Sequence, residues 1–446
     1  MLSKILVANR GEIALRVICA CRELGIRTVA VYSEADEHAL HVRFADEEVC
    51  IGPAQPLQSY LNVPAIITAA QVTGSEAIHP GYGFLSESPY LAEAAEACGI
   101  TFIGPPLEAL RLLGDKARAR HAMKRAGLPV LAGTADPPET LSAAVKASRK
   151  LGFPLIIKAS AGGGGKGMRI VRDATEVEQA WTTAQREATA AFGDGTLYLE
   201  KYIEAPRHIE FQVLADSHGQ VLHLGERECS IQRRHQKLVE EAPSVVLTDR
   251  QRRKLGRLVV DAARAVGYQN AGTFEFLMDE RERFYFLEVN TRLQVEHPVT
   301  EMVTGVDIVK EQIRVASGES LSFRQNDISI SGHAIECRIN AESSHTGRPS
   351  PGIVRVFSMP GGPGIRVDTA AHTDSTITPY YDSLVMKLIA HGRDRSEAIA
   401  RMQRALEMTV IEGIETTLPL QRRILEDPDF ISGRLDTAFM DRFSDA

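Results

Sequence analysis

The sequence lacks a long apolar run. Even with Gly and Pro counted as apolar, the longest run covers only residues 126–133. A transmembrane helix needs about 20 consecutive apolar residues, so a membrane partner is not expected. Lys4 interrupts the N-terminus before the apolar region of a signal peptide could form. These absences predict a cytoplasmic protein.

The sequence also lacks a net positive charge and cysteine pairs at the spacing typical of metal or redox sites. The 51 Lys and Arg residues against 58 Asp and Glu residues give a net charge of −7. Nucleic-acid binding needs a basic surface, so this charge balance disfavours a nucleic-acid partner. The six cysteines contain no CxxC pair and no zinc-ligand spacing. They are predicted to be free thiols in a reducing compartment.

The composition is that of a globular chain. The first 115 residues alternate between strand and helix patterns. At roughly 150 residues per domain, 446 residues suggest about three domains. A doubly wound parallel α/β sheet is the expected fold of this region. A dinucleotide site is not expected there, because the first turn, residues 9–12, has one glycine where G-x-G-x-x-G would be needed. Strands are predicted at 4–8, 28–32, 77–79 and 101–104, and helices at 11–24 and 90–98.

The pattern changes near residue 116, where two helical stretches give way to strands rich in β-branched and aromatic residues. This is typical of antiparallel sheets, so the middle of the chain is predicted to be α+β. More strands and turns follow Gly318. Helices are predicted at 117–126, 141–151 and 395–408, and strands at 155–159, 196–203, 208–215, 272–278 and 284–290.

A glycine-rich loop lies between two strand-like segments, with four glycines at 162–165 followed by Lys166. Glycine lets successive backbone N–H groups approach a phosphate closely. The segment is not a Walker A loop, because Lys166 precedes Gly167 and a strand rather than Ser or Thr and a helix. A mobile linker is the alternative, but it would not explain Lys158 and Lys166 on either side. The pattern favours a flap over a polyphosphate.

Two glutamates are expected to face each other on a hairpin. If strands 272–278 and 284–290 pair, the paired positions sum to 562 or 563, and Glu275 plus Glu288 gives 563. Asn290 then lies on the same face as Glu288, since side chains alternate along a strand. No cation in the sequence obviously separates the two carboxylates, so a divalent metal is predicted, and Mg²⁺ suits such oxygen ligands. The alternative is a wrong face assignment with two solvated glutamates.

Charged residues next to this hairpin suggest an anion site. Arg292 could hold a small planar oxyanion in a bidentate manner, and Glu296 could accept a proton from it. His297 has no partner at zinc-ligand spacing, so it is interpreted as structural. The charged run 232–237 usually means a solvated face, but it could supply phosphate-binding cations.

Seven sequence blocks together resemble the biotin carboxylase component of biotin-dependent carboxylases, within the ATP-grasp superfamily. The resemblance runs almost from end to end. It rests on residues 4–13, 79–86, 162–168, 200–203 with 206–210, 233–237, 288–298 and 336–342.

The resemblance implies a fold in three parts and a set of ligands. The parts are a Rossmann-like N-terminal domain (1–115), an ATP-grasp domain (116–317) whose mobile lid (about 131–203) carries the glycine loop, and a C-terminal biotin carboxylase domain (318–446). The implied ligands are ATP, Mg²⁺ or Mn²⁺, bicarbonate and biotin on a separate biotin carboxyl carrier protein. Carboxyltransferase subunits and a homodimer are also expected.

The resemblance further implies roles for individual residues. Bicarbonate contacts fall to Lys237, Arg292, Gln294, Val295 and Glu296, of which Glu296 is the base, and Arg338 faces the biotin ureido oxygen. Metal ligation falls to Glu275, Glu288 and Asn290. Nucleotide contacts fall to Lys116, Lys158, Gly164, Gly165, Glu200, Lys201, Tyr202, Ile203, His208, Gln232, His235, Glu275 and Glu288.

The reaction implied is carboxylation of biotin through carboxyphosphate, as the first half-reaction of acetyl-CoA carboxylase in fatty acid synthesis. Pyruvate or propionyl-CoA carboxylase is the alternative setting. Another carboxyphosphate-forming ATP-grasp ligase would lack Arg338 and its block, and a non-catalytic nucleotide-binding regulator would have lost Glu288, Arg292 or Glu296.

Three segments depart from the family pattern or imitate another motif. Residues 343–348 and 372–376 differ from the expected pattern, outside the proposed catalytic set. Residues 385–388, Val-Met-Lys-Leu, look like a biotin attachment sequence. Only 59 residues follow Lys387, fewer than a biotinyl domain would need, so Lys387 is not expected to carry biotin.

Overall fold

The N-terminal region folds as the predicted parallel sheet. In the computed structural model, which describes residues 1–134, 136–160 and 167–443, its strands run in the order β3-β2-β1-β4-β5. Ile5, Leu6 and Val7 are fully buried because helices cover both faces. The elements are β1 (Lys4–Val7), α1 (Gly11–Glu23), β2 (Arg27–Tyr32), α2 (Leu40–Phe44), β3 (Glu47–Cys50), α3 (Val63–Val72), β4 (Ala77–His79), α4 (Pro89–Ala97) and β5 (Thr101–Phe102).

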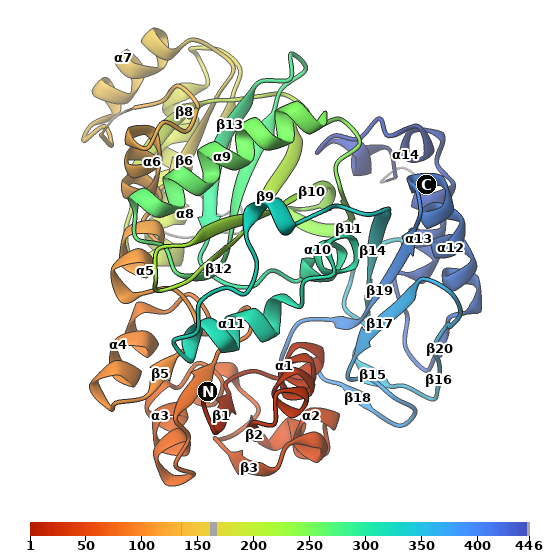
Figure 1. Ribbon diagram of the computed structural model, residues 1–446. Coiled ribbons are helices and arrows are strands. Elements are labelled where there is room, and N and C mark those ends of the chain that lie inside the picture. The colour runs from red at the N-terminus through yellow and green to blue at the C-terminus, as the bar shows by residue number, and fades with distance from the viewer. Residues whose placement is uncertain (135, 161–166, 444–446) are drawn as a thin grey trace.

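A small antiparallel sheet forms a separate layer at the far end of the molecule from this first sheet (Figure 1). Its strands run in the order β7-β6-β8, and α8 packs on it through Trp181 and Ala184. The predicted glycine flap lies between β6 and β7, and residues 161–166, which include Gly164 and Gly165, are outside the described residues. The elements are α7 (Leu141–Leu151), β6 (Leu155–Ala159), β7 (Arg169–Val171), α8 (Val177–Phe192) and β8 (Leu197–Lys201).

An eight-stranded sheet forms the middle of the molecule, in the order β13-β12-β9-β10-β11-β14-β19-β17. Its last three strands come from the C-terminal third, so that part completes the central sheet (Figure 1). The strands are β9 (Arg207–Ala215), β10 (Val221–Arg233), β11 (Gln236–Ala242), β12 (Asn270–Met278), β13 (Phe284–Asn290), β14 (His333–Asn340), β17 (Ile365–Thr369) and β19 (Leu384–Gly392).

Helices cover the faces of the central sheet. Helix α9 begins at a capping box formed by Thr248 and Gln251, which satisfies backbone N–H groups at its start. Its apolar face packs on Phe211 and Phe274. The remaining helices are α5 (Leu107–Leu113), α6 (Lys116–Arg125), α9 (Asp249–Ala265), α10 (His297–Thr304), α11 (Ile308–Ala316), α12 (Arg395–Met408), α13 (Leu418–Glu426) and α14 (Pro428–Ser432).

Two short ribbons lie beside the C-terminal strands. They consist of β15 (Gly352–Ile353) with β18 (Thr376–Ile377), and β16 (Val356–Ser358) with β20 (Val410–Glu412). The segment 343–348, which departs from the family pattern, closes a turn through the backbone hydrogen bond from Ser343 N to Arg348 O at 2.9 Å.

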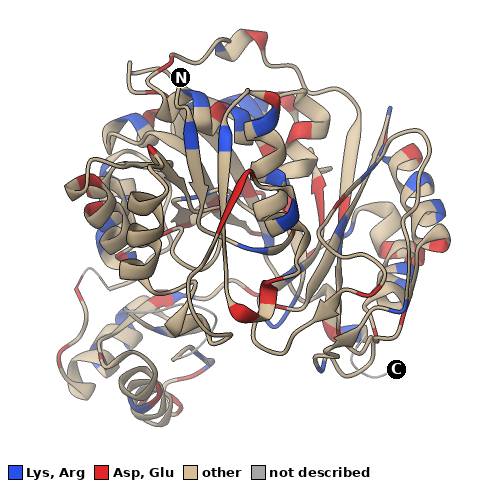
Figure 2. Cartoon of the chain, turned by 90° about the horizontal axis from the view of Figure 1, so that it is seen from below, with Lys and Arg blue, Asp and Glu red and all other residues tan. Residues whose placement is uncertain are grey.

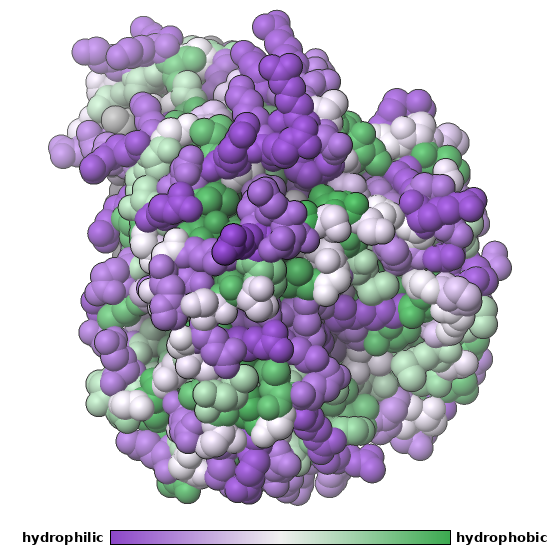
Figure 3. Space-filling view, in the orientation of Figure 1, coloured by the Kyte–Doolittle hydropathy of each residue, from purple (hydrophilic) through white to green (hydrophobic). Residues whose placement is uncertain are grey.

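The surface carries mixed charges and few large apolar patches, as the composition of the chain suggests. Basic and acidic positions are interspersed over the elements visible in Figure 2. Hydrophilic residues cover most of the face in Figure 3, with apolar residues in small separate patches. None of the described helices is both long and apolar enough to cross a membrane. All six cysteines are free thiols, as predicted.

Candidate active site

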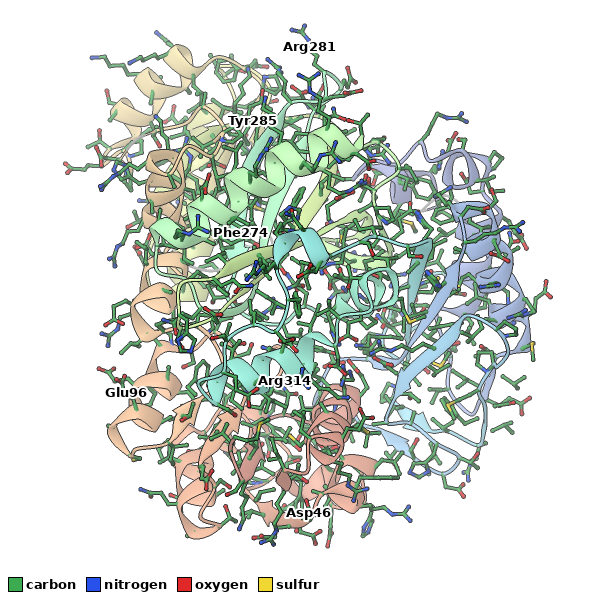
Figure 4. The ribbon with its side chains drawn as sticks, viewed as in Figure 1. Asp46, Glu96, Phe274, Arg281, Tyr285 and Arg314 are labelled. Atoms are coloured by element: carbon green, nitrogen blue, oxygen red, sulfur yellow. The ribbon has the colours of Figure 1, made fainter. Side chains whose placement is uncertain are left out.

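The hairpin of β12 and β13 places Glu275 directly opposite Glu288, as the position sums predicted. A β-bulge between Glu275 and Phe276 changes the pairing sum from 563 to 562, so both predicted registers occur in one hairpin. In Figure 4, Phe274 lies beside α9 and Arg281 extends outward from the hairpin turn. Asn290 Nδ2 donates to Glu275 Oε1 at 2.8 Å. The three predicted metal ligands are therefore neighbours.

This donor set fits Mg²⁺. Each of the three side chains offers oxygen, and Mg²⁺ prefers oxygen ligands while keeping sites for water and phosphate. The Glu288 side chain is 38% exposed, and Lys116 Nζ is 3.6 Å from its Oε2. Its carboxylate can therefore reach a ligand that arrives from solvent, while Glu275 provides a fixed, buried charge.

The expectation that no cation lies near the two carboxylates is wrong. Lys237 Nζ lies 3.1 Å from Glu275 Oε1, and His208 Nε2 lies 2.9 Å from Glu275 Oε2. Burial would raise the pKa of Glu275, but Lys237 and His208 hold it far below its usual value. Strands β9 and β11 bring these cations in, so spacing along the hairpin could not reveal them.

Lys237 is the centre of a buried ion cluster. Its Nζ lies 2.5 Å from Glu210 Oε2 and 2.6 Å from Glu296 Oε1, in addition to the contact with Glu275. Burial alone would lower the pKa of Lys237, but the three carboxylates raise it well above its usual value. The ammonium therefore stays charged, and it can offset negative charge on an anion bound beside it.

Glu296 is held from two sides. Lys237 contacts one oxygen, and Arg338 Nη2 contacts the other at 2.8 Å. The side chain is fully buried, and burial would raise its pKa, but Lys237 and Arg338 hold the pKa of Glu296 well below the usual range. Glu296 is thus an oriented, ionised carboxylate, as a proton acceptor must be.

Arg292 lies at the edge of the same cluster. Its Nε donates to Glu87 Oε2 at 3.0 Å, and its Nη1 donates to Gln294 Oε1 at 2.8 Å. Gln294 Nε2 in turn donates to Glu275 Oε1 at 3.1 Å. The predicted anion-binding segment therefore runs directly beside the predicted metal ligands.

Some of the predicted nucleotide-binding residues form two groups. His208 Nδ1 lies 2.9 Å from Gln232 Nε2, next to Glu275 on the central sheet. Lys158 Nζ lies 2.6 Å from Glu200 Oε2 on the small sheet. Others are more dispersed: Lys201 Nζ donates to the Phe153 carbonyl, Tyr202 and Ile203 follow β8, and His235 lies in the exposed β10–β11 turn.

Several residues around the ion cluster were missed. Arg227 is fully buried and donates to Glu210 Oε1 at 2.6 Å, Gln212 Oε1 at 2.8 Å and Thr300 Oγ1 at 3.0 Å. Glu240, which is also fully buried, was missed in the same way. Glu87 was missed too, but it is exposed and lies in the turn before α4. The sequence signal for Arg227 and Glu240 is a charged residue inside a strand-like segment. Such a residue is expected to be buried with a partner, because a buried charge needs one. His297 Nδ1 lies 2.8 Å from the Gln294 carbonyl, which agrees with a structural role.

Lys387 is buried inside β19 and has no exposed surface. Its Nζ lies 3.1 Å from Glu12 Oε2 and donates to the Val295 carbonyl at 3.1 Å. Burial would lower the pKa of Lys387, but Glu12 and other carboxylates raise it above its usual value. An enclosed ammonium cannot act as the nucleophile that modification requires.

We therefore expect Lys387 to remain unmodified when the folded chain is incubated with a biotin protein ligase, ATP and biotin. Peptide mass spectrometry measures the modification, and a biotinyl carrier domain in the same mixture shows that the ligase is active. Biotin on Lys387 of the folded chain, beside a biotinylated carrier, would contradict its assignment as an interior ion-pair residue.

Three family models match successive parts of the chain. They describe a biotin carboxylase N-terminal domain over residues 1–110, the ATP-binding domain of the carbamoyl-phosphate synthase L chain over 115–324, and a biotin carboxylase C-terminal domain over 336–442. The ATP-binding model covers the small sheet and most of the central sheet, where the ion cluster lies.

Individual relatives agree with these models. The chain is 56% identical to a biotin carboxylase from Allochromatium vinosum, covering 99% of this chain and 98% of the relative. It is 55% identical to a pyruvate carboxylase subunit from Methanothermobacter thermautotrophicus, covering 99% and 90%. A solved structure of the biotin carboxylase domain dimer of Hydrogenobacter thermophilus 2-oxoglutarate carboxylase, in complex with MgADP, ADP and bicarbonate, matches with a TM-score of 0.96 and 52% identity, covering 99% and 98%.

Proposed function

This chain belongs to the biotin carboxylase family, and from that premise we propose which residues of the site carry out each step of biotin carboxylation. The chain is an ATP-dependent ligase that joins a carboxyl group to biotin. The observation that carries the proposal is the ion cluster in which Lys237, Glu296 and Arg338 lie beside Glu275.

The nucleotide and the metal take the exposed side of this cluster. Glu275, Glu288 and Asn290 would hold Mg²⁺ or Mn²⁺, which when bound neutralises charge on the phosphate oxygens. Lys116, next to Glu288, supports the same end of the site. The other nucleotide contacts are proposed to come from Lys158, Gly164, Gly165, Glu200, Lys201, Tyr202, Ile203, His208, Gln232 and His235.

Glu296 removes the proton from bicarbonate. Lys237 and Arg292 hold the anion, with Gln294 and the Val295 backbone beside it. The deprotonated oxygen attacks the γ-phosphorus of ATP, the bond to ADP breaks, and carboxyphosphate forms. Oriented cations that offset charge in a water-poor cleft favour this step.

Arg338 serves the second stage. Carboxyphosphate breaks into CO₂ and phosphate, the phosphate accepts the N1′ proton of biotin, and N1′ attacks the CO₂. Negative charge develops on the ureido oxygen, and Arg338 is the cation placed to stabilise it. Its contact with Glu296 at 2.8 Å keeps the two stages within one cleft.

Biotin is proposed to arrive on a separate biotin carboxyl carrier protein, because the one lysine in an attachment-like sequence, Lys387, is enclosed. We propose acetyl-CoA carboxylase in fatty acid synthesis as the setting, with carboxyltransferase subunits as further partners, a homodimer as the assembly and the cytoplasm as the location. Two of the relatives belong to pyruvate and 2-oxoglutarate carboxylases. Identification of the biotinylated protein that co-purifies with the chain tests this setting.

Replacing Arg292 with alanine should raise the KM for bicarbonate about 10- to 100-fold, because a charge-assisted contact to the anion is lost. The KM for ATP should change less than about threefold, since within the described residues Arg292 donates to one proposed metal ligand, Asn290, and to none of the proposed nucleotide contacts. Initial rates of phosphate release at varied bicarbonate and ATP measure both constants.

Arg283→Ala is the matched control for this variant. Arg283 lies at the same hairpin, but it is 59% exposed and pairs with Asp279 at the turn. Both constants should stay near wild-type values in the control. An equal loss of ATP and bicarbonate affinity in Arg292→Ala would show that the anion role is wrong.

A further inference from the structure

The Arg338 guanidinium is divided between two buried carboxylates. Its Nε donates to Glu240 Oε1 at 2.6 Å, and its Nη2 contacts both Glu240 and Glu296 Oε2, the latter at 2.8 Å. These contacts leave Nη1 outside both ion pairs. The Arg338 side chain is 16% exposed, so part of it reaches solvent, whereas Glu240 is fully buried.

Among the described residues, Arg338 is the one hydrogen-bond and ion-pair partner of the Glu240 side chain. Its other oxygen, Oε2, is buried without a hydrogen-bond partner among the described residues. Burial raises the pKa of Glu240 to about 7, although Arg338 opposes the shift. Leaving a buried carboxylate so poorly satisfied is costly, and Arg338 is the group that compensates its charge.

Glu336 provides a natural comparison. It lies directly opposite Glu240 on neighbouring strands β11 and β14, and it is equally buried. Neither of its carboxylate oxygens has a hydrogen-bond partner within the described part of the chain. The two glutamates thus share residue type, burial and sheet position, but only Glu240 forms an ion pair with Arg338.

We propose that Glu240 is a positioning residue for biotin carboxylation, which holds the Arg338 guanidinium so that its free edge faces the cleft. Without Glu240, Glu296 is the remaining carboxylate in contact with Arg338, and arginine pairs with a single carboxylate in a bidentate manner. The Arg338 guanidinium would then turn toward Glu296 and away from the biotin ureido oxygen. This inference rests on the proposed role of Arg338.

Glu240→Gln tests the proposal with two partial reactions. Carboxylation of free biotin should fall about 30- to 100-fold, the range that a misdirected catalytic group causes. Bicarbonate-dependent ATP cleavage without biotin should fall less than about threefold, because Lys237 still holds Glu296 at 2.6 Å. Glu336→Gln, the matched control, should leave both rates within about threefold of wild type.

A double-mutant cycle separates this role from a structural one. In an Arg338→Ala background, adding Glu240→Gln should cause no further loss of carboxylation, because a residue that acts through Arg338 has nothing left to position. A further loss as large as in the wild-type background would overturn the proposal. So would an equal loss in Glu336→Gln, or equal losses in the two partial reactions.

Two further measurements show whether a negative result comes from a wrong role for Arg338 or from a loss of folding. Full biotin carboxylation by Arg338→Ala alone would refute the assigned role of Arg338 and, with it, this inference. If Glu240→Gln lowers the unfolding midpoint, nucleotide binding by calorimetry shows whether the fold is kept at the assay temperature. Glu240→Asp then restores the charge, and biotin carboxylation should recover at least partly. Failure to recover in a folded Asp variant would count against positioning by charge.

Discussion

Glu296→Gln should reduce bicarbonate-dependent ATP cleavage by about 100- to 10,000-fold, the contribution expected of a general base. Glutamine keeps the size of the side chain and one oxygen acceptor for Lys237 or Arg338, but it cannot take a proton. Nucleotide affinity should change less than about threefold, since Glu296 is proposed to contact bicarbonate rather than ATP. Phosphate release measures the first quantity, and calorimetry with MgADP measures the second.

Glu241→Gln is the appropriate control for this variant. Glu241 neighbours Glu240 on β11, is buried, and forms ion pairs with His333 at 2.6 Å and Arg395 at 2.7 Å, away from the Lys237 cluster. Its replacement removes a buried charge and can lower stability, but the catalytic rate should persist. If Glu296→Gln kept more than a tenth of the wild-type cleavage rate, another residue would have to be the base.

Glu288→Lys should abolish metal-dependent nucleotide binding. The change puts an ammonium where a carboxylate oxygen is proposed to bind Mg²⁺, and it adds a second positive charge near Lys116, which now lies 3.6 Å from Glu288. Without the carboxylate, the remaining proposed ligands are Glu275 and Asn290. We expect MgATP affinity to fall at least about 100-fold, as removal of a charged ligand and repulsion of the ion combine.

Titration of the variant with ATP, with and without Mg²⁺, measures this effect. Glu280→Lys makes the same charge change in the exposed turn of the same hairpin and should leave MgATP affinity unchanged. Tight, Mg²⁺-dependent binding by Glu288→Lys would show that the metal site lies elsewhere. Weak binding by both variants would point instead to disruption of the hairpin.

Local patterns predicted the elements well. Strand 155–159 and helices 141–151 and 395–408 have the predicted bounds, and β1, β2 and α1 agree to within one residue at either end. These elements depend on spacing and on end signals such as Gly25, which are properties of neighbouring residues. The Glu275–Glu288 pair followed from the same local reasoning, because a short turn determines which residues oppose each other in a hairpin.

Contacts between distant strands could not be predicted from spacing. Lys237 meets Glu275 and Glu296, which lie 38 and 59 positions further along the chain. Arg338 reaches Glu240 across 98 positions. Strand pairing within the hairpin therefore predicted the two opposed carboxylates correctly, but the cations that hold Glu275 come from other strands.

The amino-acid sequence alone determined the succession of elements, the face of the hairpin that carries the carboxylates, and, through its seven motif blocks, the family resemblance. Only the tertiary structure decided how each charge is compensated: that Lys387 is enclosed, that Lys237 joins three glutamates, and that Glu240 shares Arg338 with Glu296. The physical reason is that side-chain periodicity is a local property, whereas the pairing of a buried charge depends on which strands the sheet brings together.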